Sequence, residues 1–443
     1  APAREATLQL MRSSMRIPSC LLLLLRSPCA TGNTTFTLAF IYMRSDLSWL
    51  IESHSLFKLA VRQINEVGVL GPGYNLSYVA RDSEKLASAA LSAAATIMQE
   101  DASVVGVVGT GYTSALEPLA MYCSAVARKP IVSPGSTLVS LDDKSEVPFL
   151  LRSVFNDAAQ VSTLEATMRR FNWTHAAVVY HPDFQDLADQ LREAAGLNFV
   201  ATVEVPADAA DDTDEESWKT DLPLEMVKAS GARIIIVMTR TGVRKWVRRA
   251  RALGLFAPGY QWIGVASTFD SELEGSEGSS EDFLPGFLFL LPEPVAATER
   301  RRALEAAWPA VSTRYNASMH GAWDAGTGTP FFGATFDHPT DPTIWDTADD
   351  SALQGDGAVD YWGSFVYDTA WSYAYAIASL LERGASPLDG AALLEALLAT
   401  DFDGATGRVQ FDGVSQDRTH NYTLFNIARD AVGASSGRSV DVS

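Results

Sequence analysis

The sequence predicts an α/β protein with two doubly wound parallel-sheet lobes joined by three crossovers. Short, continuous apolar segments such as Arg233–Met238 are typical of parallel strands that are buried on both faces. Segments with apolar residues at helical spacing alternate with these strands, as expected when helices cover both faces of a sheet. The alternation runs once before Arg152 and begins again near Ser153, so the sequence indicates two sheets rather than one.

The first series begins with an apolar strand at Thr35–Tyr42. After it we expect helix Trp49–Val67, strand Leu76–Ala80, helix Glu84–Gln99, strand Val104–Val108, helix Ser114–Ala127 and strand Ile131–Val132. The helices are assigned from apolar residues that recur every three or four positions, and the strands from short β-branched runs. Residues 31–152 and 292–400 form the expected first lobe.

The second series has the same character. In order we expect helix Asp157–Phe171, strand Ala176–Tyr180, helix Phe184–Ala195, strand Arg233–Met238, helix Val243–Leu253 and strands Gln261–Val265 and Gly286–Leu291. Residues 153–291 and 401–430 form the expected second lobe.

The end of the chain differs from both series. Two long helices are expected at Ala296–Tyr315 and Tyr361–Leu381. The segments Arg408–Phe411 and Tyr422–Ile427 flank turn residues and are predicted to pair as a β-hairpin. Residues 431–443 are expected to be a flexible tail.

The composition is that of a globular protein, with 443 residues of which 47% are hydrophobic and 20% charged. The net charge of −20 argues against nucleic acid as a partner and against adhesion to anionic lipid. The acidic stretches follow no calcium-loop spacing, and the histidines show no metal-ligand spacing. We therefore expect no metal and no other cofactor.

The amino-terminal segment indicates export. Residues 1–30 combine a basic start, the apolar run Leu21–Leu25 and a small-residue end, which resembles a secretory signal or leader interrupted by Arg26. Removal of this segment would take Cys20 and Cys29 with it and leave Cys123, either as a buried thiol or in an intermolecular bridge.

Glycosylation sequons give a second indication of export. Asn-x-Ser/Thr occurs at Asn33, Asn75, Asn172, Asn316 and Asn421. No apolar run of about 18 residues is present, so no membrane span is expected. The chain is therefore expected to be a soluble protein or the outer part of a larger one.

Two turns carry the strongest functional signal. Gly109–Ser114 follows the strand Val104–Val108 and opens a helix, and Pro134–Thr137 follows Ile131–Val132. Backbone N–H groups at the start of a helix lack internal partners, and the helix dipole adds positive potential, so such turns favour an anionic group. No catalytic base or metal cluster accompanies them, which favours ligand binding over an enzymatic reaction.

Six motifs occur in an order that matches one family. They are Val107–Ser114, Lys129–Thr137 with Leu141–Lys144, Phe149–Val154 with Asp157 and Gln160, Arg170–Trp173, Tyr367–Ala370 and Asp401–Phe411. On these motifs the chain resembles the type I periplasmic-binding-protein-like ligand-binding region of receptors. That family includes class C G-protein-coupled receptors, ionotropic glutamate receptor amino-terminal domains and receptor guanylyl cyclases. Within it, Ala232–Val237, Val243–Lys245 and Tyr260–Trp262 are most similar to the metabotropic GABA-type branch.

The resemblance implies a small amino-acid-like ligand in a cleft between the lobes. The implied ligand-binding residues are Ser114, Gly135, Ser136, Thr137, Asp157 and Phe184. The hydroxyls of Ser114 and Thr137 would take the ligand carboxylate, assisted by the N–H groups of Gly135 and Ser136, and simple N-capping is the less favoured alternative. Asp157 is expected either to cap its helix or to take an ammonium group. Phe184 is expected either to cover the ligand or to pack in the core.

The resemblance also implies partners. Closure of the lobes, with hinges near Arg152, Leu291 and Asp401, would signal to a membrane module outside this chain. A homo- or heterodimer through the first-lobe helices Glu84–Gln99 and Ser114–Ala127 would transmit the change. The implied location is the extracellular side of the plasma membrane.

Several features limit this interpretation. The aspartate that amino-acid-binding members place after the strand containing Trp262 is absent, because Gly264–Ser267 stands there. An enzyme is the main rival, since Gly109 and Gly111 match part of a dinucleotide fingerprint. Ser114 replaces the third glycine, however, and no acidic residue follows at the required distance, so we do not expect an enzyme. A receptor guanylyl cyclase, an ionotropic receptor and a soluble small-molecule-binding protein stay as alternatives.

Overall fold

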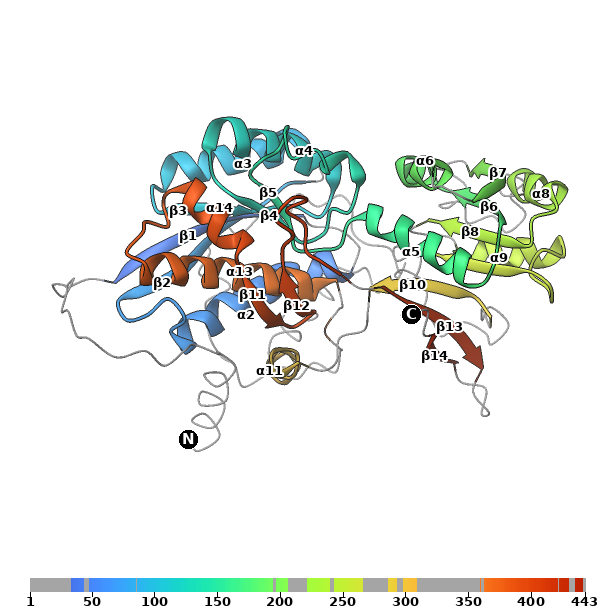
Figure 1. Ribbon diagram of the computed structural model, residues 1–443. Helices are drawn as coiled ribbons and strands as arrows, with labels where there is room; N and C mark the ends of the chain where they lie inside the picture. The colour runs from blue at the N-terminus through green and yellow to red at the C-terminus, as the bar shows by residue number, and fades with distance from the viewer. Residues whose placement is uncertain are drawn as a thin grey trace, which may run out of the picture. The chain divides into compact units, whose positions relative to one another are not determined.

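The computed structural model is drawn as a ribbon in Figure 1. It describes residues 33–43, 48–84, 86–193, 197–205, 221–239, 243–265, 286–292, 298–308, 359, 362–420, 422–429 and 435–440. The chain divides into two compact units. The first comprises Ala1–Ser136, Lys144–Val154 and Val295–Arg418, and the second comprises Thr137–Asp143, Phe155–Pro294 and Thr419–Ser443.

The lobe boundary expected near Asp401 needs correction. Residues 401–418 group with the first unit, because the side chains of Val409 and Phe411 are buried in the first hydrophobic core. The chain therefore leaves the first unit for the last time after Arg418.

The first unit is built on a five-stranded sheet in the order β2-β1-β3-β4-β5, with every neighbouring pair parallel. Its strands are β1 (Thr34–Tyr42), β2 (Tyr74–Asp82), β3 (Val104–Val108), β4 (Ile131–Ser133) and β5 (Leu150–Arg152). Its helices are α2 (Ser48–Val67), α3 (Ala87–Glu100), α4 (Thr113–Tyr122), the π-helical turn η1 (Cys123–Ala127), α11 (Glu299–Ala307), α13 (Gly363–Glu382) and α14 (Gly390–Leu398). A separate antiparallel pair joins β11 (Asp401–Gly404) to β12 (Gly407–Gln410).

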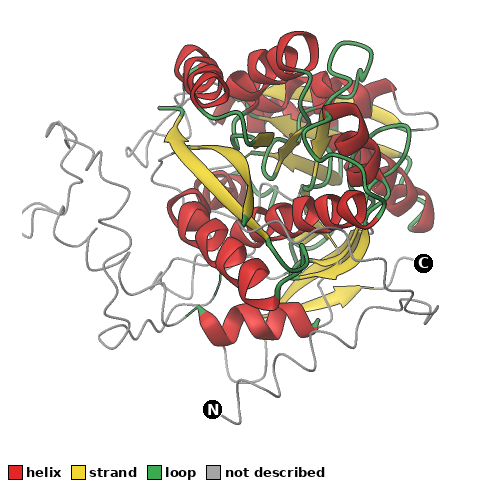
Figure 2. Cartoon of the chain, turned by 90° about the vertical axis from the view of Figure 1, so that its left-hand side faces the viewer, coloured by secondary structure: helices red, strands yellow, loops and turns green. Residues whose placement is uncertain are grey.

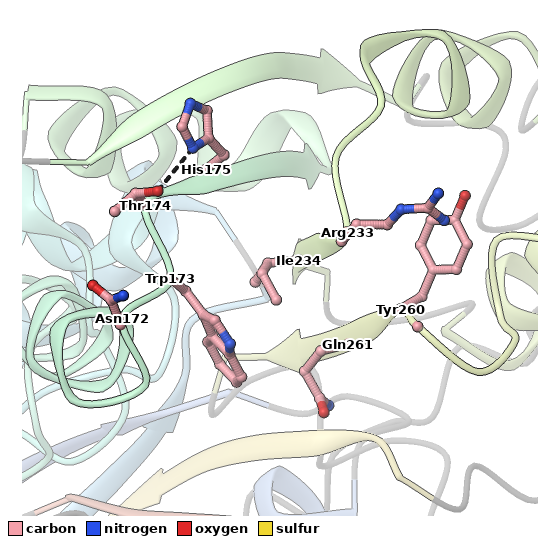
Figure 3. A pocket seen from close by; sticks show the side chains of 9 residues that line it. Asn172, Trp173, Thr174, His175, Arg233, Ile234, Tyr260 and Gln261 are labelled. Carbon is pink, nitrogen blue, oxygen red and sulfur yellow. Dashed lines mark hydrogen bonds between the residues drawn. The ribbon is translucent and has the colours of Figure 1, made fainter.

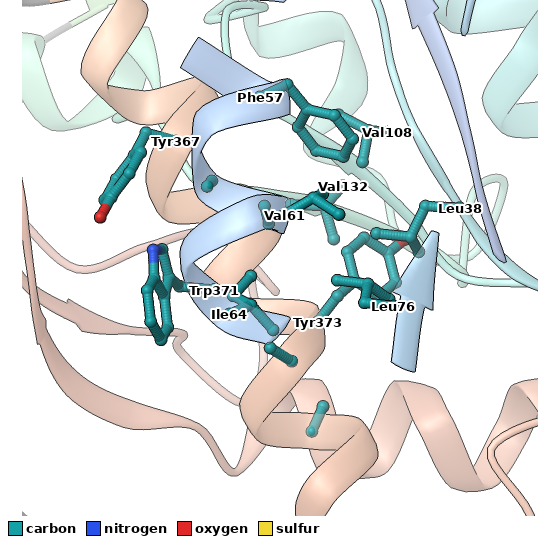
Figure 4. Close-up of a cluster of buried hydrophobic side chains, with 14 of the residues drawn as sticks. Leu38, Phe57, Val61, Ile64, Leu76, Val108, Val132, Tyr367, Trp371 and Tyr373 are labelled. Carbon is teal, nitrogen blue, oxygen red and sulfur yellow. The ribbon is translucent and has the colours of Figure 1, made fainter. Parts of the chain in front are cut away.

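Helices cover both faces of this first sheet (Figures 1 and 2). On one face α2 and α13 pack together, and Phe57, Ile64 and Tyr373 join Leu38 and Val132 in one buried cluster (Figure 4). On the other face α3 packs beside α4. Each large apolar side chain buried in this way contributes about 1.5–3 kcal/mol, which is why the apolar faces of these helices decide where they pack.

Two buried phenols tie α13 to the rest of the first unit. The Tyr373 hydroxyl lies 2.7 Å from the carbonyl oxygen of Val107 and 2.9 Å from that of Pro130. The Tyr367 hydroxyl donates to the side-chain oxygen of Gln63. Burial raises the pKa of Tyr367 to about 12 and that of Tyr373 well above its usual value of 10.0.

We expect the free energy of unfolding to fall as the pH rises above 10.0. The folded chain keeps both phenol protons at a pH at which the unfolded chain releases them, so this stability is present below that pH and is lost above it. At about pH 11 each phenol should lower the free energy of unfolding by roughly 1 kcal/mol. Urea unfolding at about pH 9 and about pH 11 measures the fall, which should be smaller in Tyr373→Phe. An equal fall in that variant would contradict the assignment.

The second unit is built on a seven-stranded sheet in the order β14-β13-β10-β9-β8-β6-β7. Its strands are β6 (His175–Tyr180), β7 (Asn198–Glu204), β8 (Ile234–Met238), β9 (Gln261–Gly264), β10 (Leu288–Pro292), β13 (Tyr422–Arg429) and β14 (Ser435–Val440). Its helices are α5 (Asp157–Arg170), α6 (Gln185–Glu193), α8 (Asp221–Ser230) and α9 (Val243–Ala252), with short 3-10 turns at η2 (Val139–Leu141) and η3 (Pro182–Phe184). The strands from β7 to β10 are parallel, and β13 is antiparallel to both of its neighbours.

Side chains of β6 alternate between two cores. Ala176 and Val178 lie in a cluster with side chains of α5 and α6. Ala177 and Val179 lie in a cluster with side chains of α8 and α9. Both faces of the sheet are therefore covered, and the prediction of two doubly wound α/β units is confirmed.

Two predictions about the end of the chain are wrong. The predicted hairpin does not form, because β12 pairs with β11 whereas β13 lies between β10 and β14. Part of the expected flexible tail is a strand, since Ser435–Val440 pairs with β13. An edge strand takes its hydrogen bonds from one neighbour, so its sequence can lack the apolar pattern by which strands are predicted. None of the described helices is long and apolar enough to cross a bilayer.

Candidate functional site

The strand order of the first sheet places both predicted turns at one edge. The order reverses direction between β1 and β3, and ligands of such sheets bind outside the carboxyl ends of strands near this switch point. The first turn follows Val108, the last residue of β3, and the second follows Ser133, the last residue of β4. Because β3 and β4 are parallel neighbours, the two turns lie side by side.

Close packing explains the glycine that opens the first turn. A Cβ atom on Gly109 would lie 2.8 Å from Leu116 Cδ1 and 3.3 Å from Ile131 Cδ1, so a larger residue would require the buried Leu116 side chain to shift. The helix begins at Thr113, and no side chain caps it. Ser114 is exposed in its first turn, where backbone N–H groups have no partner inside the helix. This end of α4 therefore keeps the donors that an anionic group requires.

The two turns are joined through one carbonyl group. The hydroxyls of Ser133 and Ser136 donate to the carbonyl oxygen of Thr110, at 3.2 and 3.5 Å. Ser133 Oγ in turn accepts the N–H groups of Ser136, at 3.2 Å, and Gly135, at 3.5 Å. The N–H groups expected to assist a ligand are thus engaged by Ser133, a residue that the sequence analysis did not select. The signal that could have found it is its place as the last residue of a buried strand, where a hydroxyl can accept from the turn that follows.

Thr137 and Asp157 contact each other within the second unit. Thr137 Oγ1 donates to Asp157 Oδ2 over 3.0 Å, and Gln160 Nε2 donates to Asp157 Oδ1 over 2.7 Å. The helix cap is Asn156, whose side chain accepts the N–H of Ala159, so capping, one of the two roles left open for Asp157, belongs to Asn156. Asp157 is 1% exposed, and its carboxylate is held by its own unit.

Phe184 takes the packing role that the sequence left open. Its side chain is 1% exposed and lies in a core cluster with Leu164, Val178 and Leu187. A side chain enclosed in this way does not present a face to a ligand, which favours the core interpretation over the covering one.

A hydroxyl at the end of β2 was not predicted. Ser83 is 0% exposed, its N–H donates to the carbonyl oxygen of Tyr42, and its hydroxyl finds no hydrogen-bond partner among the described residues. It lies at the same carboxyl edge as the two turns, because β2 is parallel to β1. A buried hydroxyl without a hydrogen-bond partner is costly. Ser83 is therefore a further candidate residue of the ligand site at this edge of the sheet.

The comparisons with known proteins give the family. Residues 54–430 match the receptor family ligand-binding region. The chain belongs to this family. It is 24% identical over 341 residues to metabotropic glutamate receptor-like protein E of Dictyostelium discoideum. The matched stretch covers 75% of this chain and 36% of that protein. It is also 28% identical over 185 residues to the metabotropic glutamate receptor of Drosophila melanogaster, covering 40% of this chain and 18% of that one.

A plant protein is similar over a shorter stretch. Glutamate receptor 2.2 of Arabidopsis thaliana is 26% identical over 168 residues, which is 34% of this chain and 17% of that protein. The chain spans 36% of the length of the first of these relatives and less of the others. The family and the parallel sheets together confirm the type I periplasmic-binding-protein-like fold.

The described part of this receptor ligand-binding region contains no group of three His, Cys, Asp or Glu side chains that could hold a metal ion. Cys123 is buried and forms no disulfide among the described residues, and burial raises the pKa of its thiol. A thiol in that state is a poor nucleophile, so Cys123 acts as a small apolar side chain.

The structure separates the predicted glycosylation sites. Asn33 and Asn172 are exposed, whereas Asn75 is half-buried in β2. Asn316 and Asn421 lie outside the described residues. Asn172 also borders a hollow of about 500 Å³ in the second unit (Figure 3). That hollow lies where β6, β8 and β9 begin, at the opposite edge of the sheet from the carboxyl ends.

Proposed function

We propose that this chain is the extracellular ligand-binding region of a membrane receptor and binds a small amino-acid-like ligand at the carboxyl edge of the first sheet. The observation that carries the proposal is the pairing of two hydroxyl-bearing turns around the Thr110 carbonyl, beside the start of α4. A ligand carboxylate would be bound by the first N–H groups of α4 and by Ser114, with Ser136 next to them.

Within the family, we propose a class C G-protein-coupled receptor of the GABA type. The similarity to two metabotropic glutamate receptor-like sequences supports the class. The lack of an acidic side chain at Gly264, the last residue of β9, argues for a ligand other than an α-amino acid. GABA carries the carboxylate that the two turns would bind and places its ammonium group farther away.

We further propose that the first unit forms a homo- or heterodimer through α3 and α4. Large apolar side chains are exposed on and beside these helices, with Leu86 at 53%, Met121 at 43% and Val126 at 67% exposure. Exposed apolar groups of this kind on neighbouring elements support a protein contact. A membrane module elsewhere in the full receptor would receive the signal.

Thermal-shift titration of the full chain tests the ligand. GABA, glutamate, glycine and succinate are the probes, and we expect one of them to raise the melting temperature. Ser114→Ala with Ser136→Ala should weaken that ligand about tenfold or more, because hydrogen bonds to a charged group contribute roughly 1.5–3 kcal/mol each. Ser162→Ala is the matched control, since Ser162 is an exposed serine of α5 in the second unit. Equal affinity in the double variant and the control would place the ligand elsewhere.

A further inference from the structure

The hollow in the second unit lies away from the edge at which ligands of parallel sheets bind, so we consider a different occupant for it. It lies at the first residues of three strands, His175, Ile234 and Gln261. Ligands of parallel sheets bind at the other edge, outside the carboxyl ends of the strands. It is an open hollow of about 500 Å³ rather than an enclosed cavity.

We propose that this hollow holds the innermost sugars of an N-linked glycan attached to Asn172. The inference rests on the extracellular location in the proposed function, because that location exposes the chain to glycosylation. Asn172 lines the hollow itself, and Thr174, the third residue of its sequon, lines it too. The acceptor and its binding surface are thus parts of one feature.

The backbone presents Asn172 to solvent. It follows α5, has φ of 54°, and is exposed. Its N–H donates to the carbonyl oxygen of Arg169 over 3.1 Å, and the N–H of Trp173 donates to that of Met168 over 2.8 Å. These two bonds form the Schellman motif, in which asparagine is one of the few side chains that tolerates the left-handed residue. Asn172 therefore stands at the end of α5 with its side chain exposed to solvent.

The walls of the hollow suit a sugar. The ring of Trp173 lies along one side, and the Arg233 guanidinium stacks over the Tyr260 ring, 4.5 Å from its centroid, on another (Figure 3). Aromatic faces pack against the C–H edges of a pyranose, and a planar guanidinium donates to its hydroxyls. Phe171 stacks on Trp173, with ring centroids 4.7 Å apart, and is 40% exposed. A glycan at Asn172 would cover the exposed ring of Phe171 in this aromatic pair.

The first test compares two sites on one protein. The full chain is secreted from cultured eukaryotic cells, and glycopeptide mass spectrometry measures occupancy at Asn172 and at the exposed Asn33. We expect Asn172 to be occupied, and an endoglycosidase acting on the folded protein to release its glycan about tenfold more slowly than the Asn33 glycan, since seated sugars must leave the hollow first. Arg233→Ala and Tyr260→Ala should both abolish that difference.

Matched variants separate the glycan from the backbone. Asn172→Gly removes the acceptor and keeps the left-handed residue, whereas Thr174→Ser keeps the sequon. We expect the secreted Asn172→Gly protein to melt at a lower temperature than Thr174→Ser, and the two to melt together when both are made in bacteria.

Three results would overturn the inference. An unmodified Asn172 beside an occupied Asn33 would do so and leave the extracellular location intact. Equal release rates at the two sites would show that the sugars do not use the hollow. A protein without a glycan at any site would contradict both this inference and the proposed extracellular location. The ligand titration would still test binding separately.

Discussion

Replacing Arg152 with leucine is expected to cost about 3–5 kcal/mol of the free energy of unfolding. Arg152 is 0% exposed, and its guanidinium donates to both carboxylate oxygens of Asp417, from Nε over 2.7 Å and from Nη2 over 2.5 Å. Asp417 is itself 3% exposed. The variant would leave that carboxylate buried without its bidentate partner, with the Lys144 ammonium 3.3 Å from Oδ1.

A double-mutant cycle with denaturant unfolding measures the pair. We expect Asp417→Leu to destabilise at least as much as Arg152→Leu, because it removes the carboxylate that pairs with both Arg152 and Lys144. The double variant should cost clearly less than the sum of the single ones, since both members of the buried pair are then absent. A cost under about 1 kcal/mol for either single variant, or strict additivity, would contradict a coupled buried pair.

The position of the pair gives it a role beyond stability. Arg152 ends β5 shortly before the chain enters the second unit, and Asp417 lies just before the chain does so again. The backbones pair there as well, because the N–H of Arg418 donates to the carbonyl oxygen of Arg152 over 2.9 Å. The ion pair therefore fixes two exits of the chain from the first unit in one conformation.

Local pattern was sufficient for most of the α/β alternation. The β-branched run Ile234–Met238 is a buried central strand, and the long apolar helix near Tyr361–Leu381 is α13. Both predictions hold because burial on several sides demands apolar residues at most positions of these elements. The partners of β12 and β13 were not predictable in the same way, since pairing between strands depends on tertiary contacts that leave no mark in either segment.

The candidate site shows the same division. Glycine and hydroxyl residues after β3 and β4 identified the two turns, because those residue types suit the start of a helix and a close backbone approach. The hydrogen bonds that these turns make could not be predicted from the sequence. Whether the N–H of Ser136 is available or engaged depends on the rotamer of Ser133, which the sheet and the neighbouring Thr110 carbonyl decide.

Two of the family motifs also proved to be one structural feature. Asp368, from the motif on α13, is 0% exposed and accepts the N–H groups of Ala405 at 2.6 Å and Thr406 at 2.8 Å, both from the motif near the end of the chain. Thr406 Oγ1 donates to the same carboxylate over 2.5 Å. Arg418 Nη1 lies 3.9 Å from it. These residues therefore stabilise the fold of the first unit. The sequence showed only that the two motifs occur in one chain, not that they contact each other.

Asp368→Ala is accordingly expected to cost about 3–5 kcal/mol of the free energy of unfolding. It would leave the donors of Ala405 and Thr406 buried without an acceptor and deprive Arg418 of its nearby anion. Asp368→Asn should also destabilise, because its amide group offers hydrogens to donors and carries no charge. Chemical denaturation of both variants gives these costs, and a change within about 0.5 kcal/mol in either, as for ordinary surface substitutions, would contradict the role assigned to the carboxylate.

Gly404 supplies a test of geometry that does not depend on charge alone. A Cβ atom at this position would lie 2.4 Å from Asp368 Oδ2, so Gly404→Ala must displace the carboxylate from its donors. In the Asp368→Ala background that oxygen is gone, and the same substitution should cost much less or even stabilise, since alanine loses less backbone entropy than glycine on folding. The cost of Gly404→Ala should therefore depend on Asp368 by more than about 1 kcal/mol. Equal losses of unfolding free energy in the two backgrounds would mean that the carboxylate does not occupy the space above Gly404. That result would also contradict the contact between the two motifs.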